Sequence, residues 1–187
     1  MAALQCTTPQ TREDRAIYRA LKLLESRMRL PGATLSSLGN VRSYLRLLLG
    51  EEDREVFAVL YLDAQNRLIE AEIPFYGTLT HTVVFPREVA RRALHHNAAA
   101  VIFAHNHPSG VLNPSGADMR LTCALKDGLE LLGVEVLDHF IVAADALFSF
   151  AECGILGMRE LPQESPPTAV AAPAKRRGRP RKETATA

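Results

Sequence analysis

The sequence has few cysteines and no long apolar run. Cys6, Cys123 and Cys153 lie far apart and form no C-x-x-C pair, which argues against a zinc ribbon or a dithiol redox site. No stretch approaches the length of a membrane-spanning helix, and the first residues, MAALQCTTPQTRED, lack the basic start and apolar stretch of a signal peptide. We therefore expect a soluble, cytoplasmic protein with no membrane partner.

Positive charge is concentrated at one end of the chain. The 187 residues carry a formal net charge of +1, but residues 175–187 hold six Lys or Arg and one Glu. This segment therefore carries +5 and leaves −4, by subtraction from +1, for the rest. From about Glu160 the chain is rich in Pro and Ala and has hardly any large apolar residue, so it cannot bury enough surface to fold. We expect a disordered basic tail over residues 159–187.

The apolar spacing of the remaining chain predicts alternating helices and strands. Thr11 and Asp14 form a capping-box pattern in an N-terminal helical segment, residues 1–36, and a second helix is expected over residues 37–49. Strands are expected over residues 55–62, 67–77, 78–85, 98–105, 134–143 and 147–150, with helices beginning at Pro86 and spanning residues 115–133. This order predicts an α/β fold with a mixed β-sheet flanked by helices.

The stretch AHNHPSGVLNPSGAD, residues 104–118, gathers groups that bind metals. His105 and His107 lie two residues apart at the end of a buried strand, so in extended backbone their side chains point the same way. Asp118 stands in the first turn of the next helix, and the Pro/Gly loop can fold back to bring its carboxylate to the same point. Two His and one Asp suit one Zn²⁺ and leave a fourth position for water, as in catalytic zinc sites.

Attack by a metal-bound water on a carbonyl also needs a base that takes the proton and passes it to the leaving amine. Glu55 begins the first predicted strand. The sequence permits this strand to pair with the strand that carries His105. Ser115 and Asp118 also match a capping box at the start of the predicted helix, and the capping and catalytic interpretations are compatible.

The run HNHPSGVLNPSGAD resembles the JAMM (MPN+) metalloprotease motif, H-x-H-P-x6-S-x-x-D, at every defined position. Residues 37–158 resemble the RadC family in REVFAVLYLDAQNRLI, GTLTHTVVFPREVARRALHHNAAAVIFAHNHPSG and LDHFIVAADALFSFAECGIL. The resemblance implies a cytidine-deaminase-like MPN domain and zinc held by His105, His107 and Asp118. It also implies Glu55 as the base, Ser115 as a donor to the oxyanion, and cleavage of an amide or isopeptide bond in a peptide substrate.

Two alternatives to this zinc hydrolase remain open at the level of sequence. The first is a nuclease linked to DNA repair, and the second is a DNA-associated scaffold with an MPN domain and no activity. One metal with a single base suits amide hydrolysis better than the two-metal arrangement frequent in nucleases.

The basic tail and two pairs of neighbouring residues that contain histidine also need interpretation. RRGRPRK, residues 176–182, resembles an AT-hook, in which Arg177, Gly178, Arg179 and Pro180 would contact A·T-rich DNA. A tail that only increases solubility or binds RNA nonspecifically is an equal alternative. His95 and His96 are expected on an exposed helix end. Asp138 and His139 form either a buried polar pair or a hydrogen bond to a metal ligand.

Overall fold

A mixed β-sheet lies at the centre of the fold. The computed structural model of the protein describes residues 11–30, 38–78, 82–144 and 146–159. Within these ranges the helices are α1 (Arg12–Arg29), α2 (Leu38–Leu49), α3 (Pro86–His95) and α4 (Gly116–Glu130). The strands are β1 (Val56–Leu62), β2 (Leu68–Tyr76), β3 (Ala100–Asn106), β4 (Glu135–Ala143) and β5 (Ala146–Ser149). The predicted α/β fold with a mixed sheet flanked by helices is confirmed.

The strand order of the sheet is β2-β1-β3-β4-β5. β1 runs antiparallel to both β2 and β3, and β5 runs antiparallel to β4. β3 and β4 are parallel, a pairing that needs a long crossover, which α4 supplies. Every residue of β1 and β3 is buried, as expected for strands covered on both faces.

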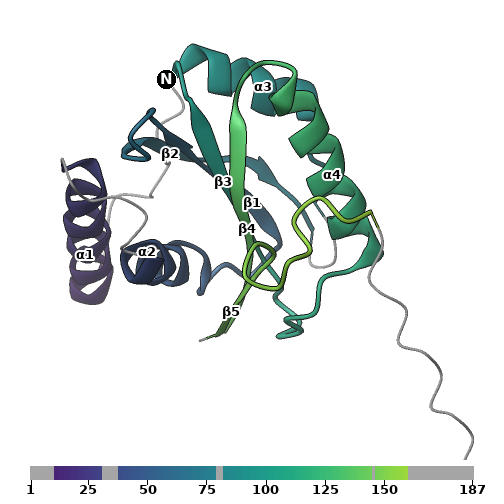
Figure 1. Ribbon diagram of the computed structural model, residues 1–187. Helices are drawn as coiled ribbons and strands as arrows, with labels where there is room; N and C mark the ends of the chain where they lie inside the picture. Colours follow the sequence, from purple (N-terminus) through teal and green to yellow (C-terminus); the bar gives the residue numbers. More distant parts are fainter. Residues whose placement is uncertain (1–10, 31–37, 79–81, 145, 160–187) are drawn as a thin grey trace, which may run out of the picture.

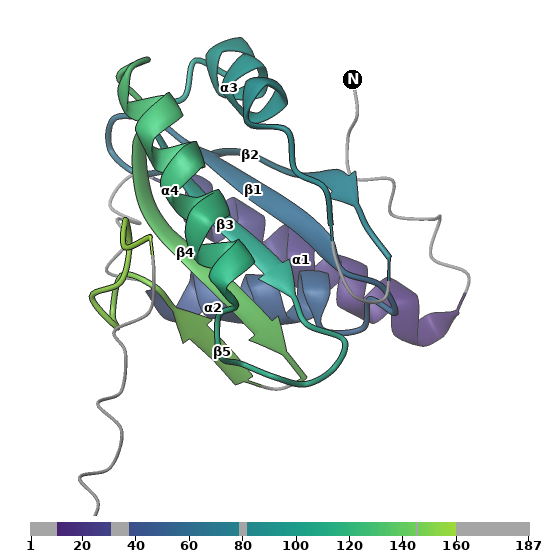
Figure 2. The same ribbon diagram turned by 90° about the vertical axis from the view of Figure 1, so that its right-hand side faces the viewer.

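Each face of the sheet packs against a different pair of helices. Met28 of α1 and Tyr44 of α2 pack with Leu60 on one face. On the other face, Val89 of α3 and Leu125 of α4 belong to a second apolar core. Figure 1 shows α1 and α2 on one side of the sheet and α3 and α4 on the other. In Figure 2, α4 crosses in front of the strands, with α1 and α2 behind.

Local sequence signals set the starts of three helices. Thr11 caps α1 through a reciprocal pair of hydrogen bonds with Asp14, and Pro86 occupies the first turn of α3. Ser115 caps α4, where the backbone N–H of Asp118 donates to the Ser115 hydroxyl and the Ser115 N–H donates to the Asp118 carboxylate. These predicted helix starts are confirmed. The capping of α4 also holds the Asp118 side chain against the helix end.

The strand predicted over residues 78–85 is wrong for the part that the structure describes. Residues 78 and 82–85 are not in a strand. The side chains of Val83 and Phe85 are 59% and 54% exposed, so these residues do not form a buried face. The Thr82 hydroxyl instead donates to the Glu55 carbonyl at 2.9 Å. The local alternation of apolar and polar residues therefore misled the prediction, because none of the described strands pairs with residues 82–85.

Candidate metal centre

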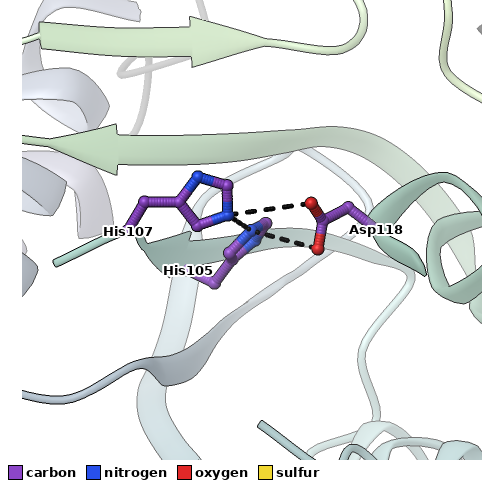
Figure 3. Close-up of side chains that lie close together, drawn as sticks. All are labelled: His105, His107 and Asp118. Carbon is purple, nitrogen blue, oxygen red and sulfur yellow. Dashed lines mark hydrogen bonds and ion pairs between the residues drawn. The ribbon is translucent and has the colours of Figure 1, made fainter. Parts of the chain in front are cut away.

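Three chain segments meet at the end of β3 where the strand leads into the loop before α4. His105 lies in β3, His107 follows the strand, and Asp118 lies in the first turn of α4. Figure 3 shows the two imidazole rings facing the Asp118 carboxylate. The predicted gathering of these side chains is therefore present. β1 pairs with β3 so that Phe57 lies opposite His105. The pairing that the sequence permitted without predicting it is therefore present.

The spacing of the three donor groups fits a metal ion. The Nε2 atoms of His105 and His107 are 3.0 Å apart. The distances from His105 Nε2 to Asp118 Oδ1 and from His107 Nε2 to Asp118 Oδ2 are 3.4 and 3.7 Å. Two donors that each bind Zn²⁺ at 2.0–2.1 Å with tetrahedral angles would lie about 3.3 Å apart. His105, His107 and Asp118 can therefore hold a metal ion.

The tautomer of His107 is fixed by its other ring nitrogen. His107 Nδ1 lies 2.6 Å from the carbonyl oxygen of Val111, which can only accept a hydrogen bond. Nδ1 therefore carries a proton, and in the neutral ring the lone pair is on Nε2, which faces His105. Two nitrogen atoms 3.0 Å apart with facing lone pairs repel each other unless a proton or a metal cation lies between them.

The pKa values of the three side chains reflect their burial and their contacts with one another. Burial lowers the pKa of His105 to about 4. Contact with Asp118 raises the pKa of His107 above 6.5, against the effect of burial. Burial alone would raise the pKa of Asp118, but the nearby imidazole of His107, that of His105 and the hydrogen bonds from Ser115 hold it well below its usual range. The carboxylate is therefore ionised at neutral pH and available as a ligand.

Glu55 shares a cleft of about 520 Å³ with His105, His107 and Asp118. Burial raises the pKa of the Glu55 carboxyl above 4.5, and the nearby charge of Asp118 adds to this effect. The main chain of Glu55 is held on both sides, since its N–H donates to the carbonyl of Thr78 and its carbonyl accepts from Gly77 N–H, each at 2.8 Å. A partly desolvated carboxylate beside the metal donors can act as a proton carrier.

Ser115 lines the same cleft, but its hydroxyl is already engaged. The hydroxyl donates to Asp118 Oδ2 at 2.7 Å and accepts from the Asp118 N–H at 3.2 Å. The structure thus shows the capping role of Ser115 directly. The oxyanion role that the family resemblance implies stays a prediction.

Asn106, between the two histidines, has a structural role that the sequence did not reveal. Its Oδ1 accepts from Val56 N–H at 2.8 Å, and its Nδ2 donates to the carbonyls of Glu52 and Arg54 at 3.1 and 2.9 Å. These contacts flank Glu55 on both sides in the sequence. Side chains alternate along a strand, so Asn106 points away from the two imidazoles. Its hydrogen-bond partners lie at the start of β1 and just before it, and they come within reach because β1 pairs with β3.

The side chains of Asp138 and His139 have different partners. The Asp138 carboxylate accepts from the Ser149 hydroxyl and the Ala151 N–H at 2.6 and 2.9 Å, so it holds the turn after β5. The His139 ring instead lies 2.8 Å from His105, measured between His139 Nε2 and His105 Nδ1. Both interpretations that the sequence left open therefore hold in part: Asp138 and His139 are buried polar neighbours, joined by the His139 N–H that donates to Asp138 Oδ1 at 2.7 Å, and His139 also contacts a metal-ligand candidate.

The prediction that His95 and His96 both lie on an exposed helix end is wrong for His96. His96 Nε2 lies 3.1 Å from Glu72 Oε1, and the ring packs against Tyr61 with a centroid distance of 4.6 Å. Glu72 also pairs with Arg92 at 2.5 Å. A partner on β2, far away in the sequence, therefore buries most of His96.

Several predictions fall on residues that the structure does not describe. Arg177, Gly178, Arg179 and Pro180, the predicted contacts to A·T-rich DNA, lie within residues 160–187, as does nearly all of the predicted disordered tail. The predicted boundary between residues 36 and 37 lies in the range 31–37, which is also outside the described residues. Among the described helices, none combines the length and apolar character needed to cross a bilayer.

The fold and the donor set together define an α/β protein with a candidate metal centre of the metallohydrolase type. The family model of the RadC-like JAB domain matches residues 35–155. The chain therefore belongs to the RadC family, with a domain of the JAB/MPN type. The described site residues all lie within the matched range.

The chain is similar to proteins that carry the name UPF0758. It is 58% identical over 137 residues to a UPF0758 protein of Chromobacterium violaceum and 56% identical over 137 residues to one of Nitrosospira multiformis. These matches cover 73% of this chain and 61% of each relative. The protein YkfG of Escherichia coli is 52% identical over 149 residues, which are 80% of this chain and 93% of YkfG. The chain thus spans about six-tenths of the length of the first two relatives.

Proposed function

We propose that the protein is a zinc-dependent metallohydrolase of the JAMM type that cleaves an amide or isopeptide bond. The observation that carries this proposal is the meeting of His105, His107 and Asp118 with Glu55 in one cleft. Imidazole and carboxylate donors suit Zn²⁺. A further carboxylate that is not needed as a ligand supplies the proton carrier that hydrolysis requires.

His105 and His107 would hold the metal through Nε2, and Asp118 would hold it through a carboxylate oxygen. Three protein donors are the number typical of catalytic zinc sites, whereas structural sites use four. Bound Zn²⁺ would supply a Lewis acid that polarises the scissile carbonyl and makes water more acidic.

Glu55 would move the proton. Its carboxylate takes a proton from the attacking water as the water oxygen bonds to the carbonyl carbon, and it delivers this proton to the leaving nitrogen as the C–N bond breaks. Burial raises the pKa of Glu55 toward the working pH, which makes it a better base for this transfer. The Ser115 hydroxyl would donate a hydrogen bond to the negative charge that develops on the carbonyl oxygen. For this, the hydroxyl must give up its hydrogen bond to Asp118 Oδ2.

The number of metal-ligating clusters favours an amide bond over a phosphodiester. Among the described residues, His105, His107 and Asp118 form one such cluster. Nucleases and phosphatases frequently clamp the phosphate between two metal ions. The donor groups that the described part of the chain brings together provide for one ion.

The experiment that tests the proposal compares zinc-loaded wild type with Glu55→Gln on fluorogenic peptide libraries with α-amide and Lys ε-amide linkages. Glu55→Gln should keep one zinc per chain and lose at least about a hundredfold in rate, the lower end of a general-base contribution. Glu130→Gln is the matched control, because Glu130 is exposed at the end of α4 and does not line the cleft of Glu55, so the change should leave the rate unchanged. Hydrolysis by Glu55→Gln at the wild-type rate, or no hydrolysis of any amide by the loaded wild type, would contradict the proposal.

A further inference from the structure

A chain of hydrogen bonds behind the candidate metal centre links two of its three donors. His139 of β4 lies opposite Phe103 in the parallel pairing of β3 and β4. His139 Nε2 is 2.8 Å from His105 Nδ1, and His139 Nδ1 is 2.6 Å from the hydroxyl oxygen of Thr122 in α4. The Thr122 hydroxyl is in turn 2.6 Å from the carbonyl oxygen of Asp118. The chain thus runs from the ring of His105 to the backbone of Asp118.

The direction of each hydrogen bond in this chain follows from the bond between Thr122 and the Asp118 carbonyl. The Asp118 carbonyl can only accept, so the Thr122 hydroxyl donates its one proton to it. Toward His139, the Thr122 oxygen is then the acceptor, and His139 Nδ1 must carry a proton. A neutral His139 has its lone pair on Nε2 and accepts from His105 Nδ1–H. His105 Nε2 is therefore left with a lone pair that points at the other donors.

The surroundings of His139 keep its ring neutral. The side chain is fully buried, and the rings of Phe57, Phe103 and Phe150 lie around it at centroid distances of 5.6, 5.9 and 4.8 Å. Both ring nitrogens are taken by His105 and Thr122, and within the described part of the chain no carboxylate is hydrogen-bonded to them. An imidazolium buried in such a site without a paired anion is strongly disfavoured. Thr122 is also buried, with 1% of its surface exposed.

We propose that Thr122 and His139 are positioning residues that hold His105 as the Nδ1–H tautomer and present its Nε2 lone pair to the metal. His107 reaches the same tautomer by a simpler route, through the Val111 carbonyl. The role of Thr122 and His139 in metal binding rests on the proposed zinc site, whereas the tautomer is a property of the metal-free protein. Partners that orient a ligating histidine typically change metal affinity 10- to 100-fold when they are removed.

Thr122 offers a matched pair of variants. Thr122→Val keeps the shape of the side chain but has no hydroxyl, and Thr122→Ser restores the hydroxyl. We expect Thr122→Val to bind Zn²⁺ roughly tenfold more weakly than wild type, as measured by competition with a chelator at pH 8, and Thr122→Ser to stay within about threefold of it. A role limited to packing would instead let Val substitute well and would leave the zinc affinity of Thr122→Val unchanged.

The metal-free wild type provides a test that needs neither a variant nor zinc. Nitrogen-15 NMR of the histidine rings at pH 8 should find the proton of His105 and of His139 on Nδ1 in both cases. In Thr122→Val, His139 loses its acceptor, and the Nδ1–H signals of His139 and His105 should shift or broaden. His105 protonated on Nε2 in the wild type, or a zinc affinity of Thr122→Val equal to wild type, would overturn the proposal.

The two proposals fail in different ways. If the wild type binds no zinc, the proposed function and the metal-binding role of Thr122 and His139 both fall, while the NMR measurement still decides the tautomer. If the wild type binds zinc but Thr122→Ser is as weak as Thr122→Val, the hydroxyl is not what matters, and the positioning role is refuted while the zinc site stands.

Discussion

Replacing Asn106, the last residue of β3, by Ala should destabilise the protein more than any surface change in the loop that follows it. Asn106 is 3% exposed, and its amide group makes hydrogen bonds to backbone atoms of Val56, Glu52 and Arg54. These bonds tie the end of β3 to the segment that contains Glu55. No side chain in the described structure takes over the three partners when the amide is removed, so the change leaves backbone groups without partners.

The expected loss in the free energy of unfolding follows from how deeply each hydrogen-bond partner of Asn106 is buried. Val56 is fully buried, and a buried N–H left without an acceptor costs about 1–3 kcal/mol. The two carbonyl partners are only partly buried, so water can replace Asn106 and each loss costs about 0.5–1.5 kcal/mol. The sum is about 2–6 kcal/mol, with a central value of about 4 kcal/mol, which for a chain of this size lowers the melting temperature by about 8–16 °C.

The assay is urea unfolding of the metal-free protein, because bound metal would add its own stabilisation. Ser109→Ala is the control in the same loop. Ser109 is exposed, and its replacement should change the free energy of unfolding by no more than about 0.5 kcal/mol. A loss below about 1 kcal/mol in Asn106→Ala would show that the amide contacts do not hold this end of the sheet.

Three further predictions concern protons and the start of α4. His105 is neutral and buried with a pKa of about 4, so the unfolded chain binds the proton first as the pH falls. The stability that the neutral, buried ring of His105 contributes is complete above pH 6.5 and is lost toward pH 4. In urea unfolding, the free energy of unfolding of the metal-free protein should therefore fall by about 2 kcal/mol between pH 7.5 and 5, and that of His105→Asn should fall less. Because the pKa of His107 is raised above 6.5, zinc binding at pH 7 should release part of a proton, which calorimetry in buffers of different ionisation enthalpy measures; a heat that is independent of the buffer would contradict this. Ser115→Ala and Thr11→Ala each remove a helix cap and should each cost about 1 kcal/mol, but only Ser115→Ala should also weaken zinc binding, roughly tenfold, because Asp118 loses a donor. Equal zinc affinities in these two variants would count against a role of Ser115 in holding Asp118.

The sequence predicted those features that depend on nearby residues. The capping boxes of Thr11 and Ser115 need only a partner three residues away. The buried apolar run of β3 identifies a strand with cover on both faces, and its histidines then fall at one end. The same local reasoning failed for residues 78–85, where the alternation resembles that of a strand but Val83 and Phe85 face solvent.

The features that the sequence did not predict depend on pairings between distant segments. Asn106 finds its partners only because β1 lies beside β3. His139 reaches His105 through the register of the parallel strands β3 and β4, and Thr122 reaches His139 through the placement of α4 over them. His96 is partly buried against Glu72 of β2. Residue types and spacing along one segment carry no information about such contacts.

The proposed function depends on a zinc ion held by His105, His107 and Asp118. The most direct test is the metal content, by mass spectrometry, of protein purified without added metal, for the wild type, His107→Ala and Asp118→Ala. The account predicts about one zinc per wild-type chain, the number that one such donor set holds, and loss of the zinc in both variants. A wild type without bound metal that also takes up none on exposure to zinc, or variants that keep the full zinc content, would contradict it.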